Sequence, residues 1–193
     1  MTSKTEQKER THETILESAA RLVREKGISG ARVADVMKGA GLTVGGFYAH
    51  FASKEALVDD ALRRTAGRMR ERLFAGLDAK DEGDRAEVVL KRYVSAAHRD
   101  DVSLGCPFPA VVGEVATTAG EHRDVLAEQV EAFAGELQRY LRTNDVLQRR
   151  HLALGLLALM YGGISFARAL RGTPLSDEMI RACRAFGRIV VRP

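Results

Sequence analysis

The chain has 193 residues, of which 45% are hydrophobic and 29% are charged, and this balance excludes an intrinsically disordered protein. Residues 1–72 contain 14 Lys and Arg against 10 Asp and Glu, whereas residues 73–193 contain 16 of each. The whole formal excess of +4 therefore lies at the N-terminal end, as expected for a chain that contacts nucleic acid there.

The N-terminal residues 1–10 are polar and have no apolar core, which argues against a signal peptide and predicts a mobile arm. A first helix is predicted over about residues 11–26, with Gly27 after it. The most apolar stretch, residues 152–164, is shorter than the roughly 20 residues that span a bilayer. With two cysteines far apart in the sequence, we expect a reduced protein in the cytoplasm.

The segment from residue 33 to residue 52 predicts two short helices joined by a tight turn. Gly41 ends the first helix, because glycine accepts the left-handed backbone that follows a helix terminus. Thr43 is expected to be the N-cap of the second helix. Two such helices form a helix-turn-helix, whose second member enters the major groove of DNA. The first helix has the i, i+3, i+4, i+7 spacing of a buried face, with Val33, Val36, Met37 and Ala40.

The second helix contains two adjacent glycines, Gly45 and Gly46, each of which costs about 1 kcal/mol relative to alanine in a helix. Their missing Cβ atoms permit close approach to another surface. Phe47 and Phe51, four residues apart, are expected to face inward, and Ser53 is expected to cap the next helix. The alternative is an ordinary glycine-rich helical hairpin.

The residues around these glycines predict how the segment contacts DNA. Several side chains can donate hydrogen bonds to phosphate oxygens, whereas Val44 offers only apolar contact, such as to a thymine methyl group. Arg32 can reach a guanine edge through its bidentate guanidinium. Few direct base contacts imply recognition of DNA shape and a steep dependence on salt. The predicted DNA-binding residues are Arg32, Thr43, Val44, Gly45, Gly46, Tyr48, His50 and Lys54.

The rest of the chain predicts further helices and no strand. One recognition helix reads only a few base pairs, so two copies about one helical turn, ~34 Å, apart would read a palindrome. Small residues in the last two helices permit close approach by another helix. The predicted helices cover about residues 53–77, 85–99, a segment from 107, 121–142, 146–170 and 177–190.

Residues 27–57 resemble the N-terminal domain of the TetR family of transcriptional regulators. The resemblance implies an all-α protein with a helix-turn-helix DNA-binding domain over residues 1–52 and a helical effector-binding and dimerisation domain over residues 53–193. It implies a homodimeric repressor that leaves its double-stranded DNA operator when a small-molecule effector binds. The matching residues are Val33, Asp35, Val36, Ala40 to Thr43, Gly46 to Tyr48, His50, Phe51 and Ser53 to Leu57.

The resemblance also implies an effector cavity and a dimer interface in the C-terminal part. Apolar residues at helical spacing are more typical of an ordinary core, so each cavity residue has that alternative. No cluster of charges in the sequence marks the cavity as a receptor for a strongly ionic ligand. Candidate cavity residues are Met69, Phe74, Tyr93, His98, Phe108, Phe133 and Tyr161. Candidate interface residues are Leu152, Leu156, Leu159, Gly163, Ile180 and Phe186.

Cys106 is a candidate sensor because it follows Gly105 and precedes Pro107, which favours the first position of a helix. At an N-cap the helix dipole and free amides would stabilise its thiolate, so that modification of Cys106 could replace the small molecule. The alternative is a small buried hydrophobic residue, as expected for Cys183.

Two other classes of function compete with a regulator. A small-molecule enzyme would use Cys106 as nucleophile and His98 as base, although spacing alone does not bring them together. A DNA-coating protein without effector control would need basic character along the whole chain, and residues 73–193 are neutral. We therefore expect no enzyme. We expect no cofactor and no metal site, because the five histidines are scattered.

Overall fold

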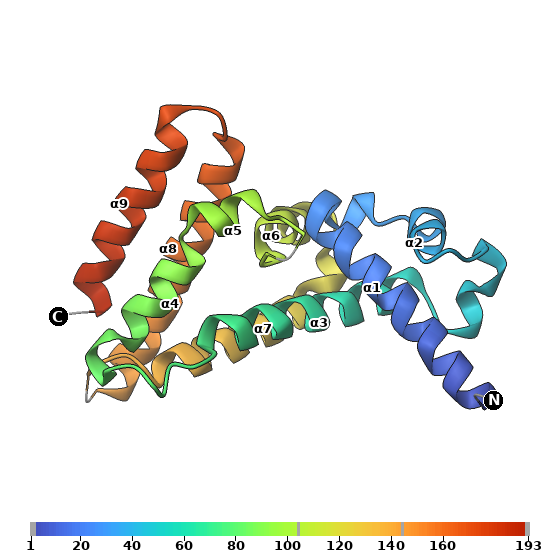
Figure 1. Cartoon of the computed structure of the whole chain (residues 1–193), viewed down its shortest axis with the longest axis horizontal. Helices are drawn as coiled ribbons and strands as arrows, with labels where there is room; N and C mark the ends of the chain where they lie inside the picture. Colours follow the sequence, from blue (N-terminus) through green and yellow to red (C-terminus); the bar gives the residue numbers. More distant parts are fainter. Residues whose placement is uncertain (1–2, 104, 144, 192–193) are drawn as a thin grey trace. The chain divides into compact units, whose positions relative to one another are not determined.

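The computed structural model describes residues 3–103, 105–143 and 145–191, and within these ranges every regular element is helical. This confirms the predicted all-α fold (Figure 1). The α-helices are α1 (Lys4–Gly30), α2 (Val33–Gly39), α3 (Lys54–Phe74), α4 (Arg85–Tyr93), α5 (Ala96–Asp100), α6 (Phe108–Thr117), α7 (Arg123–Gln138), α8 (Val146–Ala169) and α9 (Pro174–Val191). Three 3₁₀ helices are η1 (Val44–Ala49), η2 (Glu82–Asp84) and η3 (Gly120–His122).

The chain forms two compact units that are each discontinuous in sequence. The N-terminal unit comprises residues 1–67 and 106–127, and the C-terminal unit comprises residues 68–105 and 128–193. The N-terminal unit thus reaches beyond the predicted domain limit at residue 52, because the first part of α3 and all of α6 share its core.

The core of the N-terminal unit is built on one face of α1. Ile15, Ala19 and Val23 on that face are fully buried, and so is Val36 of α2. The hydroxyl of Ser18 donates a hydrogen bond of 2.9 Å to the Val36 carbonyl and ties α2 to α1. Helix α6 packs on the same helix and contributes Val111 and Val115 to this core.

Helix α1 begins at Lys4, so the predicted mobile arm is wrong for residues 4–10, while residues 1 and 2 lie outside the described part. The reason is a capping box at its start. The Ser3 hydroxyl accepts from the Glu6 amide at 3.2 Å, and the Glu6 carboxylate accepts from the Ser3 amide at 2.8 Å. These two bonds satisfy amides that a helix start otherwise leaves unpaired.

The C-terminal end of α1 is kinked at Gly27, which has a φ of +74°. An added Cβ there would overlap the carboxylate of Glu114 on α6. That carboxylate accepts a hydrogen bond of 2.8 Å from the Ser29 amide beyond the kink. The left-handed glycine and the glutamate together hold the last turn of α1 against α6.

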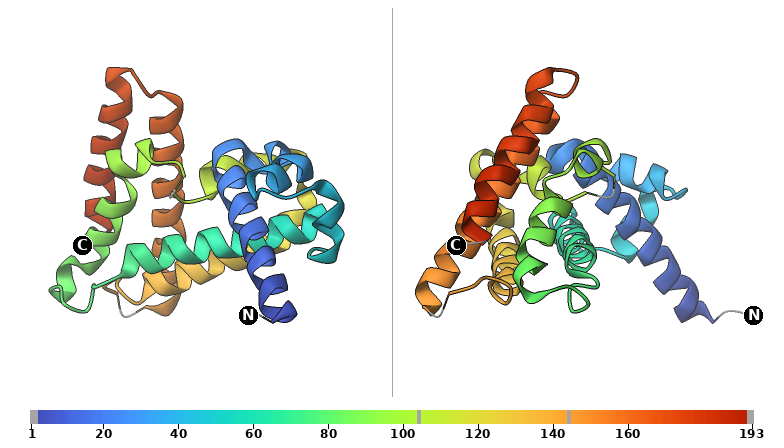
Figure 2. Two further views of the ribbon diagram at one scale, coloured as in Figure 1. Left: turned by 45° about the vertical axis from the view of Figure 1, so that its right-hand side comes forward. Right: turned by 60° about the vertical axis from the view of Figure 1, so that its left-hand side comes forward.

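In the C-terminal unit, α8 and α9 form an antiparallel pair with α4 beside α9 (Figures 1 and 2). Gly163 of α8 lies against Cys183 of α9, where an added Cβ would come within 2.7 Å of the sulfur. Cys183 is therefore a core residue, as predicted, and burial raises its pKa. Gly187 of α9 lies equally close to Leu90 of α4. Small residues thus set the close packing of this unit.

Three predicted helices differ from the observed ones. The helix predicted over residues 85–99 is broken, because the Ser95 hydroxyl accepts from the His98 amide at 3.1 Å and starts α5 as a separate helix. Helix α3 ends at Phe74, before Gly76 with its φ of +67°. Helix α7 ends at Gln138, where the amides of Arg139 and Tyr140 bond to carbonyls three residues back.

By length and composition alone, helix α8 is long and apolar enough to cross a membrane. The sequence did not indicate this, because its most apolar stretch, residues 152–164, has only 13 residues. A core helix meets the same criterion. Here α8 packs extensively on α9, and Leu156, Met160 and Ile164 are buried.

Candidate nucleic-acid interface and ligand pocket

The turn between α2 and η1 has the predicted geometry. Gly41 follows α2 with a φ of +71°, the left-handed conformation that favours glycine. The Leu42 amide bonds to the Met37 carbonyl at 2.9 Å, and the Gly41 amide bonds to the Lys38 carbonyl at 3.0 Å. These bonds close the end of α2 and direct the chain into the second helix of the motif.

The second helix of the motif, which was predicted as a short helix, is a 3₁₀ helix. Two glycines in six residues disfavour an α-helix, and short 3₁₀ turns are common in such connections. Thr43 occupies the N-cap position with an extended backbone, as predicted, although its side chain makes no capping hydrogen bond. Ser53 does cap α3, because its hydroxyl accepts from the Ala56 amide at 3.2 Å.

One face of η1 is anchored and the other is open. Phe47 is fully buried and Phe51 is 4% exposed, and their rings stack at 6.0 Å. On the open face, Tyr48 is 76% exposed and Val44 is 50% exposed. The aromatic pair fixes the helix on the core, while its outer side chains and backbone face solvent.

Within the described part of the chain, no contact or backbone angle requires glycine at residues 45 and 46. Neither has a positive φ. An added Cβ at Gly45 would meet no atom within 4 Å, and one at Gly46 would meet only the Met37 methyl group at 3.9 Å. Since the fold tolerates a larger residue here, the glycines are explained best by close approach of an external surface.

The other predicted DNA-contacting residues divide by exposure. Arg32 and Thr43 are exposed, whereas His50 and Lys54 are half-buried. The Nδ1 atom of His50 is buried, and it has no hydrogen-bond partner within the described part of the chain. Burial, together with nearby His12 and Lys8, lowers the pKa of His50. A neutral His50 donates through one ring nitrogen only.

Sequence reasoning missed the first turns of α1 as part of this surface. His12 stacks on Phe51 at 4.3 Å, and a pocket lies between Lys8, His12 and the end of η1 at Ala49 and His50. The sequence does indicate that a helix begins here, because Ser3 followed by Glu6 is the pattern of a capping box.

The C-terminal unit contains a cavity of about 240 Å³ at the end of α3 and around α5. Of the predicted effector residues, only Met69 and His98 line it. Tyr93 packs edge-on against His98 at 4.6 Å. Three of its lining residues, Arg72, Arg92 and Asp101, are charged, although no cluster of charges in the sequence indicated this. The described residues that line it are Met69, Arg72, Leu73, Arg92, Ala97, His98, Asp101 and Gly105.

The remaining predicted effector residues lie elsewhere. Phe74 and Phe133 are buried against each other at 5.7 Å in the core of the C-terminal unit. Tyr161 is half-buried on α8. Cys106 and Phe108 belong to the N-terminal unit and are 2% and 3% exposed. Cys106 precedes the N-cap residue Pro107, so its predicted place at the N-cap is wrong.

His98 is held in one tautomer. Its Nδ1 lies 2.7 Å from the Tyr93 carbonyl, which can only accept, so Nδ1 carries the proton. Burial lowers the pKa of His98 to about 4, and the ring is therefore neutral at pH 7. His98 therefore contributes a fixed, polar and uncharged side chain to the cavity wall.

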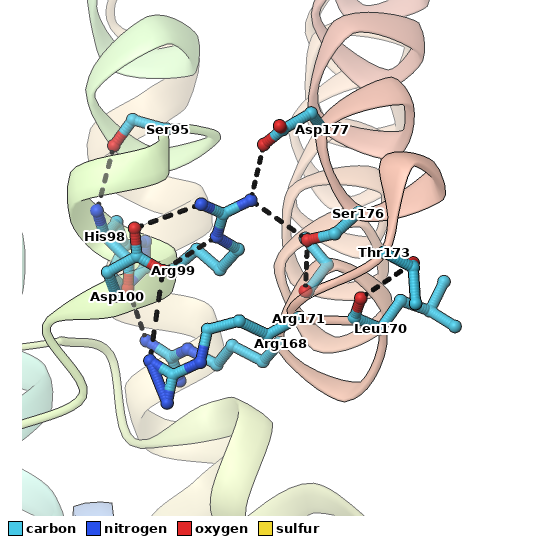
Figure 3. A network of polar contacts seen from close by, with 11 residues as sticks. Ser95, His98, Arg99, Asp100, Arg168, Leu170, Arg171, Thr173, Ser176 and Asp177 are labelled. Carbon is cyan, nitrogen blue, oxygen red and sulfur yellow. Dashed lines mark hydrogen bonds and ion pairs between the residues drawn. The ribbon is translucent and has the colours of Figure 1, made fainter.

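A polar network holds α5 against the end of α8 and the start of α9 (Figure 3). Arg168 donates to the His98 carbonyl at 2.8 Å. Arg99 donates to Ser176 at 3.0 Å and to Asp177 at 2.6 Å. These bonds fix the wall of the cavity that carries His98.

The interface residues predicted on α8 and α9 are mostly covered within the chain itself. Leu156, Gly163 and Ile180 are buried within the single chain, and Leu152 and Leu159 are half-buried, so their part in a dimer interface stays a prediction. Phe186 is 61% exposed, as an interface residue requires. Further exposed apolar residues that the prediction omitted are Phe166, Leu175 and Ile189.

The open face of η1, its anchored base and the glycine turn define a helix-turn-helix DNA-binding protein. Residues 15–61 match the family model of bacterial regulatory proteins of the tetR family, and residues 83–183 match that of the tetracyclin repressor-like C-terminal domain. The chain belongs to the TetR family of transcriptional regulators.

Curated relatives include the HTH-type transcriptional repressor KstR2 of Rhodococcus jostii, which is 33% identical over 88 residues. That alignment covers 44% of this chain and 43% of the relative. KstR2 of Mycobacterium tuberculosis is 47% identical over 49 residues, which are 25% of this chain and 24% of the relative. The chain thus matches less than half the length of these relatives.

Solved structures of similar fold include a TetR regulator from Chloroflexus aurantiacus, with 24% identity, a TM-score of 0.76 and coverage of 94% of this chain and 96% of that chain. The reduced form of E. coli NemR has 20% identity, a TM-score of 0.75 and coverage of 91% and 96%. At these identities the likeness concerns the fold.

Proposed function

We propose that the chain is a homodimeric repressor of the cytoplasm that binds a palindromic DNA operator and is released when a small molecule binds. The observation that carries this proposal is the open glycine backbone of η1 on a buried aromatic base. The names of the KstR2 relatives support repression over activation.

The contacts with DNA follow from residues that are exposed or half-buried on this surface. Tyr48 and Lys54 donate to phosphate oxygens, and the backbone amides at Gly45 and Gly46 approach the duplex closely. Val44 contacts a thymine methyl group, while Arg32 at the start of α2 reads a guanine edge. With one arginine for base reading, DNA shape carries much of the specificity.

The second copy packs on the exposed apolar face of α8 and α9. Phe166, Phe186 and Ile189 are each at least 60% exposed in the single chain. On α8, Gly155 and Gly162 leave open space where a Cβ would stand. Exposed apolar surface of this kind marks a protein interface. Dimerisation places two copies of η1 on the two halves of a palindrome.

The effector binds the cavity beside His98. Burial of Cys106 and its place before the helix cap favour this small-molecule route over modification of the thiol. Effector control requires that the ligand bind more tightly to the conformation that does not bind DNA than to the conformation that does.

The test is selection from a library of randomised duplexes with the purified full chain at low salt. We expect enrichment of one palindromic sequence, and a control variant with Tyr48→Ala should enrich none. Enrichment of no sequence by the unmodified chain, or equal retention of every duplex, would rule the proposal out.

A further inference from the structure

The cavity beside His98 contains two arginine side chains from different helices. Arg72 lies in the last turn of α3, and Arg92 lies in the last turn of α4. Arg72 contacts the sulfur of Met69, with 3.8 Å between its Nη2 and the sulfur. Within the described residues no carboxylate pairs with either guanidinium, whereas nearby Arg70 pairs with Glu136 and Arg99 pairs with Asp177.

Arg92 is a fixed positive charge. Its Nη1 donates to the Leu73 carbonyl at 2.6 Å and to the Ala75 carbonyl at 2.8 Å, both at the end of α3. These two bonds hold the guanidinium at the cavity wall. Within the described residues Arg72 has no such anchor to the backbone, and it is an exposed residue, so it is the arginine that can turn toward a ligand.

Asp101 limits how much negative charge the cavity accepts. Its carboxylate lines the same cavity and accepts a hydrogen bond of 2.8 Å from Ser103. With His98 neutral, two arginines and one aspartate give the lining a formal charge of +1. This balance suits a ligand with one negative charge and disfavours a phosphate dianion.

The remaining lining is apolar and the volume is small. Met69, Leu73 and Ala97 offer hydrocarbon contacts. A volume of about 240 Å³ exceeds the roughly 150 Å³ cavity that holds benzene and lies below the range of ~300–1,000 Å³ for drug-sized ligands. The cavity fits a molecule on the order of ten non-hydrogen atoms.

We propose that this cavity binds a small monocarboxylic acid, with its carboxylate on Arg72 beside the fixed charge of Arg92 and its hydrocarbon part against Met69, Leu73 and Ala97. The inference deepens the proposed effector control and rests on it for its biological meaning. The binding itself is testable without DNA.

The experiment is calorimetric titration of the full chain with hexanoate and with hexanamide, which has nearly the same shape and no charge, at equal ionic strength. We expect hexanoate to bind about tenfold more tightly, as for one charge-assisted hydrogen-bonded pair. The Arg72→Gln variant should lose this preference, whereas Asp101→Asn should tighten hexanoate binding. Arg63→Gln, on the same helix and outside the cavity, is the matched control and should leave both affinities unchanged.

Equal binding of acid and amide, no binding of either, or a preference that survives Arg72→Gln would overturn the inference. Circular dichroism of each variant checks that it is folded. The same samples are tested on the selected duplex. If the duplex binds and hexanoate does not, only the ligand class is wrong; if hexanoate binds and no duplex does, the proposed repressor function is wrong.

Discussion

Replacing Gly45 with alanine should strengthen the fold and weaken DNA binding at the same time. A Cβ at Gly45 would meet no atom within 4 Å, and its φ is not positive, so the folded chain accepts alanine without strain. Alanine also reduces the conformational freedom of the unfolded chain, so the free energy of unfolding should rise by about 0.4–1 kcal/mol.

In the proposed complex with DNA, the same methyl group would stand between the backbone and the duplex. If each half-site loses one hydrogen bond to a phosphate worth about 1.5 kcal/mol, a palindrome loses about 3 kcal/mol, or roughly a hundredfold in affinity. Urea unfolding measures the first effect, and fluorescence anisotropy with a labelled operator measures the second.

The matched control is Gly67→Ala in α3, where an added Cβ also meets no atom within 4 Å. It should stabilise the chain by about 1 kcal/mol and leave DNA affinity unchanged. The reasoning fails if Gly45→Ala binds the operator as tightly as the unmodified chain, or if both variants lose affinity alike.

Four further predictions concern other residues. Lys54→Ala should weaken binding to all duplexes alike and reduce the slope of log affinity against log salt by about 1 per half-site, whereas Arg32→Ala should change which base is preferred, as repeated selection would reveal. Phe186→Asp should dissociate the dimer in sedimentation experiments while leaving helicity unchanged, and a dimer that persists would refute the interface. Because the pKa of His98 falls to about 4 in the folded chain, the unfolded chain binds more protons between about pH 4 and pH 6.5. Stability should therefore drop as pH falls, by about 2 kcal/mol from pH 7 to pH 5 on account of this residue, and His98→Asn should show a correspondingly flatter profile in urea unfolding.

Local patterns predicted the motif because its contacts are local. Gly41 takes the positive φ that its place after α2 requires, and Phe47 and Phe51 are buried as their spacing indicates. The start of α1 was equally local, since the capping box of Ser3 and Glu6 is visible in the sequence. The glycine pair that marks η1 also makes it a 3₁₀ helix, a consequence of low helix propensity.

The cavity depended on packing between distant segments. Arg72 and Arg92 are 20 positions apart in the sequence and meet because Arg92 bonds to the end of α3. The periodicity of a single helix does not predict that residues of two different helices line one cavity. The same holds for α8, where the sequence shows an apolar helix but not that Gly163 faces Cys183 of its own chain and Phe166 faces solvent.

The stoichiometry on a selected palindrome tests most directly whether paired copies of η1 read DNA. Sedimentation of the full chain with a duplex carrying both half-sites should give two chains per duplex, and a duplex with one half-site scrambled should bind far more weakly. Equal affinity for the two duplexes, with one chain bound to each, would contradict dimeric recognition.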